Sequence, residues 1–133
     1  MTIEETIYNE VKNRCELPTN AYGIGAWDHH IKIVYELAKK YANEYGASIE
    51  IVALAALLHD IASVTDVSYT EEHHIIGAQI AEELLLKENY PEEKIELIKK
   101  CILNHRGSRL VEKHTPEEIC IADSDAMAHF YSI

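Results

Sequence analysis

Apolar residues recur at intervals of three and four along most of the chain, the spacing that places them on one face of an α-helix. Such segments cover residues 3 to about 15 and 27 to 45, and others follow Thr70, Pro91 and Thr115. On the segment after Thr70, Ile76, Ile80 and Leu84 share a predicted inner face. Alternation with a period of two, which predicts a strand, extends over no useful length. The pattern predicts an all-α fold of about six helices.

One segment is apolar on every side. After the capping residue Ser48, residues 51–58 contain no polar side chain. A helix that is apolar all round is buried within its protein. We therefore expect a central helix from Ile49 to about Ala62, with the others packed around it, and a short polar segment over residues 63–68.

A polar pair, His59 and Asp60, closes this apolar run. A buried carboxylate is too costly to leave without a cation, which must be a basic side chain or a metal ion. Other inward polar residues on the predicted helices are candidates to share such an ion: His30, His73, His105 and one of Asp123 or Asp125.

Imidazole nitrogen and carboxylate oxygen together suit a divalent ion such as Mn, Fe, Ni, Co, Zn or Mg. Ligands on several rigid helices fix the coordination geometry and leave positions for water. A set without sulfur disfavours a structural zinc site. Taken alone, an inward histidine such as His30 is more often a hydrogen-bonded core residue than a ligand. It is the adjacent pair at the end of the most buried helix that favours a metal.

Length and charge narrow the classes of partner. The 133 residues predict a single domain over 1–133. The net charge of −11 argues against duplex nucleic acid or an anionic membrane as the main partner.

An acidic N-terminus and the absence of a bilayer-length apolar run predict a cytoplasmic protein. The three cysteines show no CxxC spacing, so we expect them to be reduced and structural.

Four segments resemble the HD superfamily of metal-dependent phosphohydrolases. Residues 27–31 (WDHHI) are similar to its W-x-x-H-I/V segment, and residues 57–61 (LLHDI) contain its L-H-D-I signature. Residues 73–78 (HHIIGA) and 102–105 (ILNH) resemble the H-x-x-x-G-A and I-x-x-H segments of relatives that hold two metals. The order of these segments covers nearly the whole chain.

The resemblance implies an all-α HD domain that hydrolyses a phosphomonoester, nucleotide or dinucleotide with a metal-activated water. His59 and Asp60 would be catalytic. The implied metal ligands are His30, His59, Asp60, His73, His105 and Asp125. The H-x-x-x-G-A and I-x-x-H segments imply a possible second ion, held by His73 and His105. Asp125 is preferred because Met127 follows it by two positions, as Leu or Met does in the family; Asp123 is expected to support the ligands. His74 is expected to face outward or to contact substrate.

Phosphate oxygens need cationic partners, and Arg106 and Arg109 follow His105 closely. They are candidates for binding a small phosphorylated substrate, with a solvated basic turn as the alternative. The family often has a lysine three positions after the HD pair, where this chain has Ser63. A metal-binding domain without turnover therefore remains an alternative function. A di-iron oxygenase is another, which the resemblance implies because some HD-type relatives perform oxygenation at a di-iron site. The apolar residues near Ile133 need cover, which a further helix or a homodimer would supply.

Overall fold

The computed structural model describes residues 1–21, 23, 25–69, 72–104 and 115–131. These residues form seven α-helices, one π-helical and one 3₁₀ segment, and no strand. The all-α prediction is confirmed. Seven helices replace the predicted six because the expected central helix is divided in two. No helix within the described ranges is long and apolar enough to cross a membrane.

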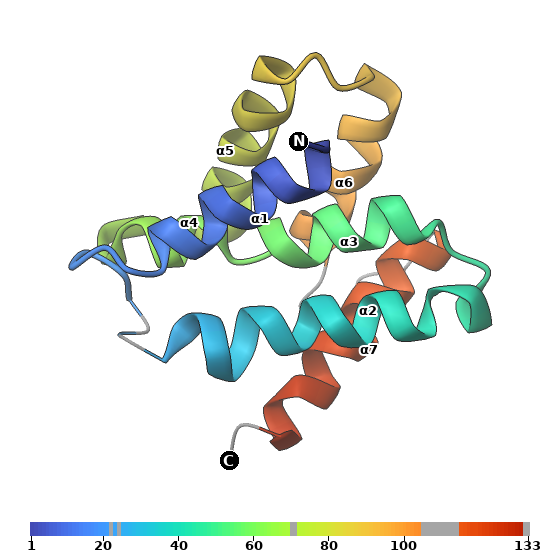
Figure 1. Cartoon of the computed structure of the whole chain (residues 1–133), viewed down its shortest axis with the longest axis horizontal. Coiled ribbons are helices and arrows are strands. Elements are labelled where there is room, and N and C mark those ends of the chain that lie inside the picture. Colours follow the sequence, from blue (N-terminus) through green and yellow to red (C-terminus); the bar gives the residue numbers. More distant parts are fainter. Residues whose placement is uncertain (22, 24, 70–71, 105–114, 132–133) are drawn as a thin grey trace.

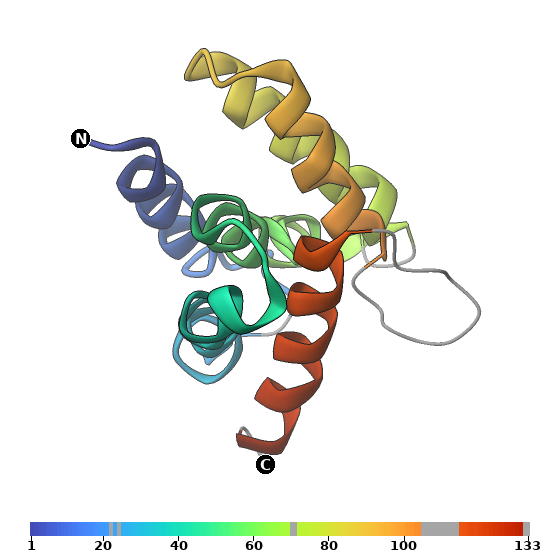
Figure 2. The same cartoon turned by 90° about the vertical axis from the view of Figure 1, so that its right-hand side faces the viewer.

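The central element is α3, which the other helices surround (Figure 1). Helix α1 crosses it on one side, α2 and α7 lie on the other, and α5 and α6 form a hairpin that extends away from it (Figure 2). In chain order the elements are α1 (Ile3–Arg14), η1 (Trp27–Ile31), α2 (Lys32–Tyr45), α3 (Ile49–Leu58), α4 (Ile61–Thr65), η2 (Val67–Tyr69), α5 (His73–Lys87), α6 (Glu92–Asn104) and α7 (Pro116–Tyr131).

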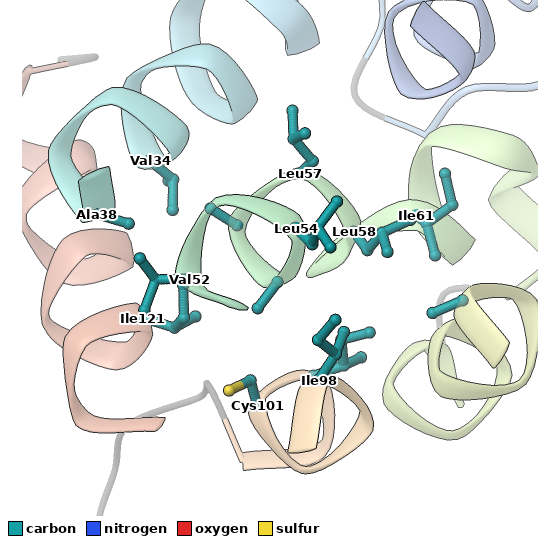
Figure 3. Close-up of a cluster of buried hydrophobic side chains, with 14 of the residues drawn as sticks. Val34, Ala38, Val52, Leu54, Leu57, Leu58, Ile61, Ile98, Cys101 and Ile121 are labelled. Carbon is teal, nitrogen blue, oxygen red and sulfur yellow. The ribbon is translucent and has the colours of Figure 1, made fainter. Parts of the chain in front are cut away.

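Helix α3 is buried on all sides, as its sequence predicts. Every residue from 51 to 58 is buried. Figure 3 shows its side chains pointing in several directions, toward Val34 of α2, Ile98 of α6 and Ile121 of α7. Each large apolar side chain buried in this way contributes roughly 1.5–3 kcal/mol. The residues at the end of α3 are therefore held by the best-packed part of the molecule.

Helix caps follow the sequence signals at most ends. The Glu5 amide donates to Thr2 Oγ1 at 3.1 Å, while Glu5 Oε1 accepts from the Thr2 amide at 2.9 Å, which completes a capping box. Ser48 caps α3, and Gly46 ends α2 with a φ of 70°. The prediction that Thr70 caps α5 is wrong: the helix begins at His73 with Glu72 as its N-cap and no side-chain cap, and Thr70 lies outside the described residues.

The buried face of α5 is wider than predicted. Ile80 and Leu84 pack against the core but are only partly buried, as is Ile76. The buried residues are Gly77, Ala78, Ala81 and Leu85. A Cβ placed on Gly77 would lie 3.5 Å from Ile102 Cγ2 and 3.7 Å from Ile61 Cγ2. Small residues thus let α5 approach α4 and α6 closely, which a pattern of large apolar residues does not indicate. The three cysteines are free and buried, as predicted.

Candidate metal centre

The chain breaks its central helix at the HD pair. Helix α3 ends at Leu58, and α4 begins at Ile61 after Asp60, whose φ and ψ are −118° and 24°. The prediction of one helix to Ala62 is therefore wrong. An aspartate at an N-cap usually binds the amides of the next turn, but no side-chain cap is formed here. The turn directs the Asp60 carboxylate to the end of α3, where the histidines lie.

His59 is oriented by the last turn of α3. Its Nδ1 donates a hydrogen bond of 2.6 Å to the carbonyl oxygen of Ala56, one of the carbonyls left without an amide partner where the helix ends. The side chain is fully buried, so the ring cannot rotate into solvent. With the proton on Nδ1, the lone pair of Nε2 is directed at the centre, which is the arrangement typical of metal-binding histidines.

His30 lies on the π-helical turn η1. The Lys32 amide donates to the carbonyl of Trp27, five residues earlier, which defines this wider turn. The Trp27 ring packs edge-on against Tyr8 of α1, with centroids 4.8 Å apart. Single π-helical turns occur frequently at functional sites. His30 Nε2 lies 3.1 Å from Asp60 Oδ2 and 3.1 Å from Asp125 Oδ1.

Helix α7 contributes Asp125, at the edge of the stripe formed by the buried residues Ile121, Ser124 and Ala128. Asp123 lies elsewhere and accepts a hydrogen bond of 2.7 Å from the Tyr45 hydroxyl. This bond is the main cause that raises the pKa of Tyr45 to about 12. The structure thus places Asp125 with the histidines, whereas the described contact of Asp123 is to Tyr45 at the end of α2.

The spacing of the four groups fits a single ion. The two Nε2 atoms of His30 and His59 are 3.3 Å apart, and His59 Nε2 lies 3.2 Å from Asp60 Oδ2 and 3.5 Å from Asp125 Oδ1. Ligand bonds of roughly 2.0–2.2 Å place neighbouring ligand atoms about 3.0–3.5 Å apart around one metal. His30, His59 and Asp60 accordingly form one of the potential metal-binding groups found among the described residues.

The centre favours positive charge. Burial acts to lower the pKa of His59, but the charge of Asp60 and hydrogen bonds to Asp125 and Asp60 outweigh it and hold the pKa well above its ordinary value. Burial likewise opposes protonation of His30, yet hydrogen bonds to Asp125 and Asp60 raise its pKa. Two carboxylates facing two imidazoles therefore stabilise a cation at this point, either protons or a metal.

A residue that the sequence analysis missed, His129, completes the group on its open side. Its Nε2 lies 3.8 Å from Asp125 Oδ1, and its ring centroid lies 5.1 Å from that of His30. The side chain is 70% exposed. His30, Asp125 and His129 form a second potential metal-binding group. The available signal was the spacing of four residues between Asp125 and His129, which puts both on one helix face.

The remaining predicted residues are not brought into these groups by the described structure. His73 begins α5, and its ring lies over that of His74 with centroids 3.9 Å apart. Both ring nitrogens of His74 are buried, so the prediction that it faces outward is wrong. His105, Arg106 and Arg109 lie outside the described residues. The second ion and the two arginine contacts therefore stay predictions.

Ser63 occupies the position where relatives often carry a lysine. It is fully buried within α4 rather than part of the polar segment predicted over residues 63–68. Its Oγ has no hydrogen-bond partner among the described residues, while its carbonyl accepts from the Ala21 amide at 2.9 Å. Ser63 therefore does not present a polar group to solvent at the centre.

Comparison with known proteins identifies the family. The model of the HD domain family matches residues 27–129, a range that contains all four converging residues. Ribonuclease Y of Petrotoga mobilis and of Thermotoga maritima are each 32% identical over 108 residues, which is 81% of this chain and 19% of theirs. The chain thus spans about a fifth of the length of these relatives.

A crystal structure from an uncultured Thermotogales bacterium, described as a predicted HD superfamily hydrolase, shares the fold. Its TM-score is 0.72 at 24% identity, and the match covers 96% of this chain and 74% of that one. The shared fold and the family match agree with each other. The chain belongs to the HD domain family.

Proposed function

We propose that this chain is a metal-dependent hydrolase of phosphate esters or anhydrides. The observation that carries the proposal is the convergence of His30, His59, Asp60 and Asp125, which come from four separate elements. Each imidazole Nε2 lies 3.1–3.5 Å from the two carboxylate oxygens and from the other Nε2. Membership of the HD domain family supports a hydrolase. Four ionisable groups that converge within the core are costly unless a cation balances the carboxylates, which supports a bound metal ion.

A metal held here would lower the pKa of a bound water from 15.7 to about 7 and would draw charge from a phosphoryl oxygen. His30 and His59 would hold the ion through Nε2, and Asp125 and Asp60 would each hold it through a carboxylate oxygen. Asp60 would also orient the attacking water and accept its proton. Because His59 is fixed by Ala56 and by complete burial, the ligand set is in place before substrate arrives.

The ligand chemistry supports a transition metal. Two imidazoles and two carboxylates suit Mn, Fe, Co, Ni or Zn better than Mg, which prefers oxygen ligands and retains several waters. We propose one tightly held ion at the described group. A second ion at His73 and His105 remains part of the proposal because the H-x-x-x-G-A and I-x-x-H segments are present.

The substrate is proposed to be small. A net charge of −11 repels long polyanions, so a nucleotide or a dinucleotide is favoured over duplex nucleic acid. The name of the relatives, ribonuclease Y, supports testing a phosphodiester in RNA as well, and a linear dinucleotide contains that bond. Arg106 and Arg109 are the residues that we propose to contact the phosphate.

The test is a hydrolysis screen on metal-free protein reloaded with each ion in turn. The substrates are a phosphomonoester, an aryl phosphodiester, nucleotides, a linear dinucleotide and a short RNA. We expect activity with Mn²⁺ or Co²⁺ that falls at least a hundredfold in Asp125→Asn. Asp123→Asn is the matched control, since it makes the same change two residues away in a carboxylate bonded to Tyr45. Equal activity of the two variants would contradict the proposed role of Asp125.

A metal-binding domain without turnover is the second candidate, favoured by Ser63 in the position of the family lysine and by its complete burial. In that case the protein would bind one ion, Asp125→Asn would lose it, and no substrate would be hydrolysed. An oxygenase would show two irons per chain and oxygen consumption. Metal content and the two assays therefore separate the three functions.

A further inference from the structure

We propose that His129 is an additional metal ligand on the solvent side of the centre and that it increases the preference of the site for transition metals over Mg²⁺. The inference rests on the proposed metal centre and extends it by one residue. Neither the HD segments of the sequence nor the spacing of the four buried groups includes His129.

The geometry of α7 places His129 correctly for this role. It follows Asp125 by one helical turn, so both side chains leave α7 on the same face. Its Nε2 lies 3.8 Å from Asp125 Oδ1, slightly longer than the spacing of neighbouring ligands on one ion. The ligand atoms of His30, Asp125 and His129 all lie within 4.8 Å of one another. A rotation of the exposed His129 side chain, with the backbone unchanged, is the movement that this role requires.

Burial distinguishes this histidine from the other two. His59 is fully buried and the His30 side chain is 16% exposed, whereas that of His129 is 70% exposed. The centre is therefore closed by α3 and α4 on one side and by His129 on the side facing water. An exposed ligand on a single helix can leave the ion when a substrate oxygen takes its place, while the buried ligands stay bound.

A third imidazole changes which ion is preferred. Nitrogen ligands strengthen binding of Co²⁺, Ni²⁺ and Zn²⁺, while Mg²⁺ binds oxygen and readily keeps a water at an open position. Loss of His129 should therefore weaken Co²⁺ binding by at least about tenfold, the lower limit seen when groups that support a metal ligand are removed. Mg²⁺ binding should change by less than about threefold, since water replaces the imidazole.

A purely structural role is the competing explanation. His129 lies in the last turn of α7, where a positive side chain interacts favourably with the helix dipole and with an acid four residues earlier. Arginine at this position would keep both interactions, but its guanidinium has no lone pair to give a metal. His129→Arg therefore retains the structural role and removes the ligand.

The experiment compares wild type, His129→Ala, His129→Arg and His29→Ala. His29 is the matched control, because it is exposed, adjacent to His30 and absent from both ligand groups found among the described residues. Dissociation constants for Co²⁺ and Mg²⁺ are measured by calorimetry, and nitrogen hyperfine couplings of bound Cu²⁺ count the coordinated imidazoles. Circular dichroism verifies that each variant is helical.

We expect His129→Ala to lose affinity for Co²⁺ at least tenfold and to keep that for Mg²⁺. The guanidinium of His129→Arg lies beside Asp125 and repels any cation, so this variant should lose affinity for both ions. Both variants should show one coordinated imidazole fewer than wild type and His29→Ala. The inference is overturned if Co²⁺ affinity and the imidazole count match wild type in either variant. If wild type itself binds none of these ions, the proposed function fails together with it. If wild type binds Co²⁺ and both His129 variants bind it equally well, the inference about His129 fails and the proposed metal centre stands.

Discussion

Two of the polar clusters that link helices of this molecule differ in the cation that balances the charge of their carboxylates. Between α1 and α2, Lys39 Nζ lies 2.7 Å from Glu4 Oε2, and the Tyr35 hydroxyl donates to the same carboxylate oxygen. At the end of α3, the described ion-pair partners of Asp60 are His30 and His59. The first cluster contains a lysine, whose charge is permanent at neutral pH, whereas the second relies on imidazoles.

The difference separates a structural cluster from a functional one. Burial acts to raise the pKa of Glu4, but hydrogen bonds from Lys39 and Tyr35 outweigh it, so the carboxylate is ionised and satisfied. An imidazole is charged only when protonated, so the Asp60 cluster accepts either protons or a metal ion. A site whose charge balance depends on an exchangeable cation is suited to binding and catalysis.

The largest effect is expected from Asp60→Asn, which keeps the shape of the side chain and removes its charge. Bound metal should fall from at least one ion per chain to a trace, because the neutral amide removes one of the two carboxylate charges that balance the ion, and His30, His59 and Asp125 bind it too weakly without that charge. Elemental analysis after dialysis measures the change. His59→Ala should behave in the same way with helical content largely kept. Full metal retention by both variants would disprove the metal centre.

His73→Ala tests whether the protein holds a second metal ion. If a second ion lies beside the first, this variant should lose one of two ions per chain and keep the one held by His30 and His59. The reason is that His73 stands in the first turn of α5, outside the four converging groups. Titration with Mn²⁺ under saturating conditions gives the stoichiometry. One ion in wild type and no change in the variant would remove the second site.

Bound metal should increase the free energy of unfolding through the Asp60 cluster, and removal of the metal should not change the contribution of the Glu4 cluster. A ligand at one hundred times its dissociation constant stabilises the folded state by about 2.7 kcal/mol. Mn²⁺ at that level should raise the free energy of unfolding of the wild type by this amount and leave Asp125→Asn unchanged. Glu4→Gln should lower the baseline and keep the full increment, because its cluster contains its own cation. An increment that disappears in Glu4→Gln would contradict the separation.

Four of the residues proposed from the sequence, His30, His59, Asp60 and Asp125, converge at the end of α3, but the backbone that holds them was not predicted. The apolar run 51–58 predicts the buried helix and so the position of His59 and Asp60. Nothing in that run indicates the break after Leu58, because it contains no glycine or proline. The break arises from tertiary structure: a continuous helix would not direct the carboxylate to His30. The π-helical turn η1 similarly has no compositional signature.

His129 escaped the sequence analysis for a different reason. Metal ligands were sought on inward faces, and an exposed histidine in the last turn of a helix resembles an ordinary surface residue. Only its contacts with Asp125 and His30, which depend on the packing of α7 against α2 and η1, distinguish it. The sequence pattern indicated only part of the inner face of α5, because large isoleucines outweigh glycine and alanine in a hydrophobic pattern, although small residues allow the closest packing.

The smallest predicted effect concerns pH and the Glu4 cluster. The folded-state pKa of Glu4 is lowered below its ordinary value of 4.5, so its contribution to stability is present above that pH and is lost as pH falls through the folded pKa. Because Lys39 is 37% exposed, solvent screening limits the contribution to at most about 1 kcal/mol. Urea unfolding of wild type and Glu4→Gln should therefore differ by up to this amount at pH 7 and converge at strongly acidic pH. A difference that is the same at both pH values would show that Glu4 acts through packing instead, and the contrast between a permanent and an exchangeable cation would then rest on the metal centre alone.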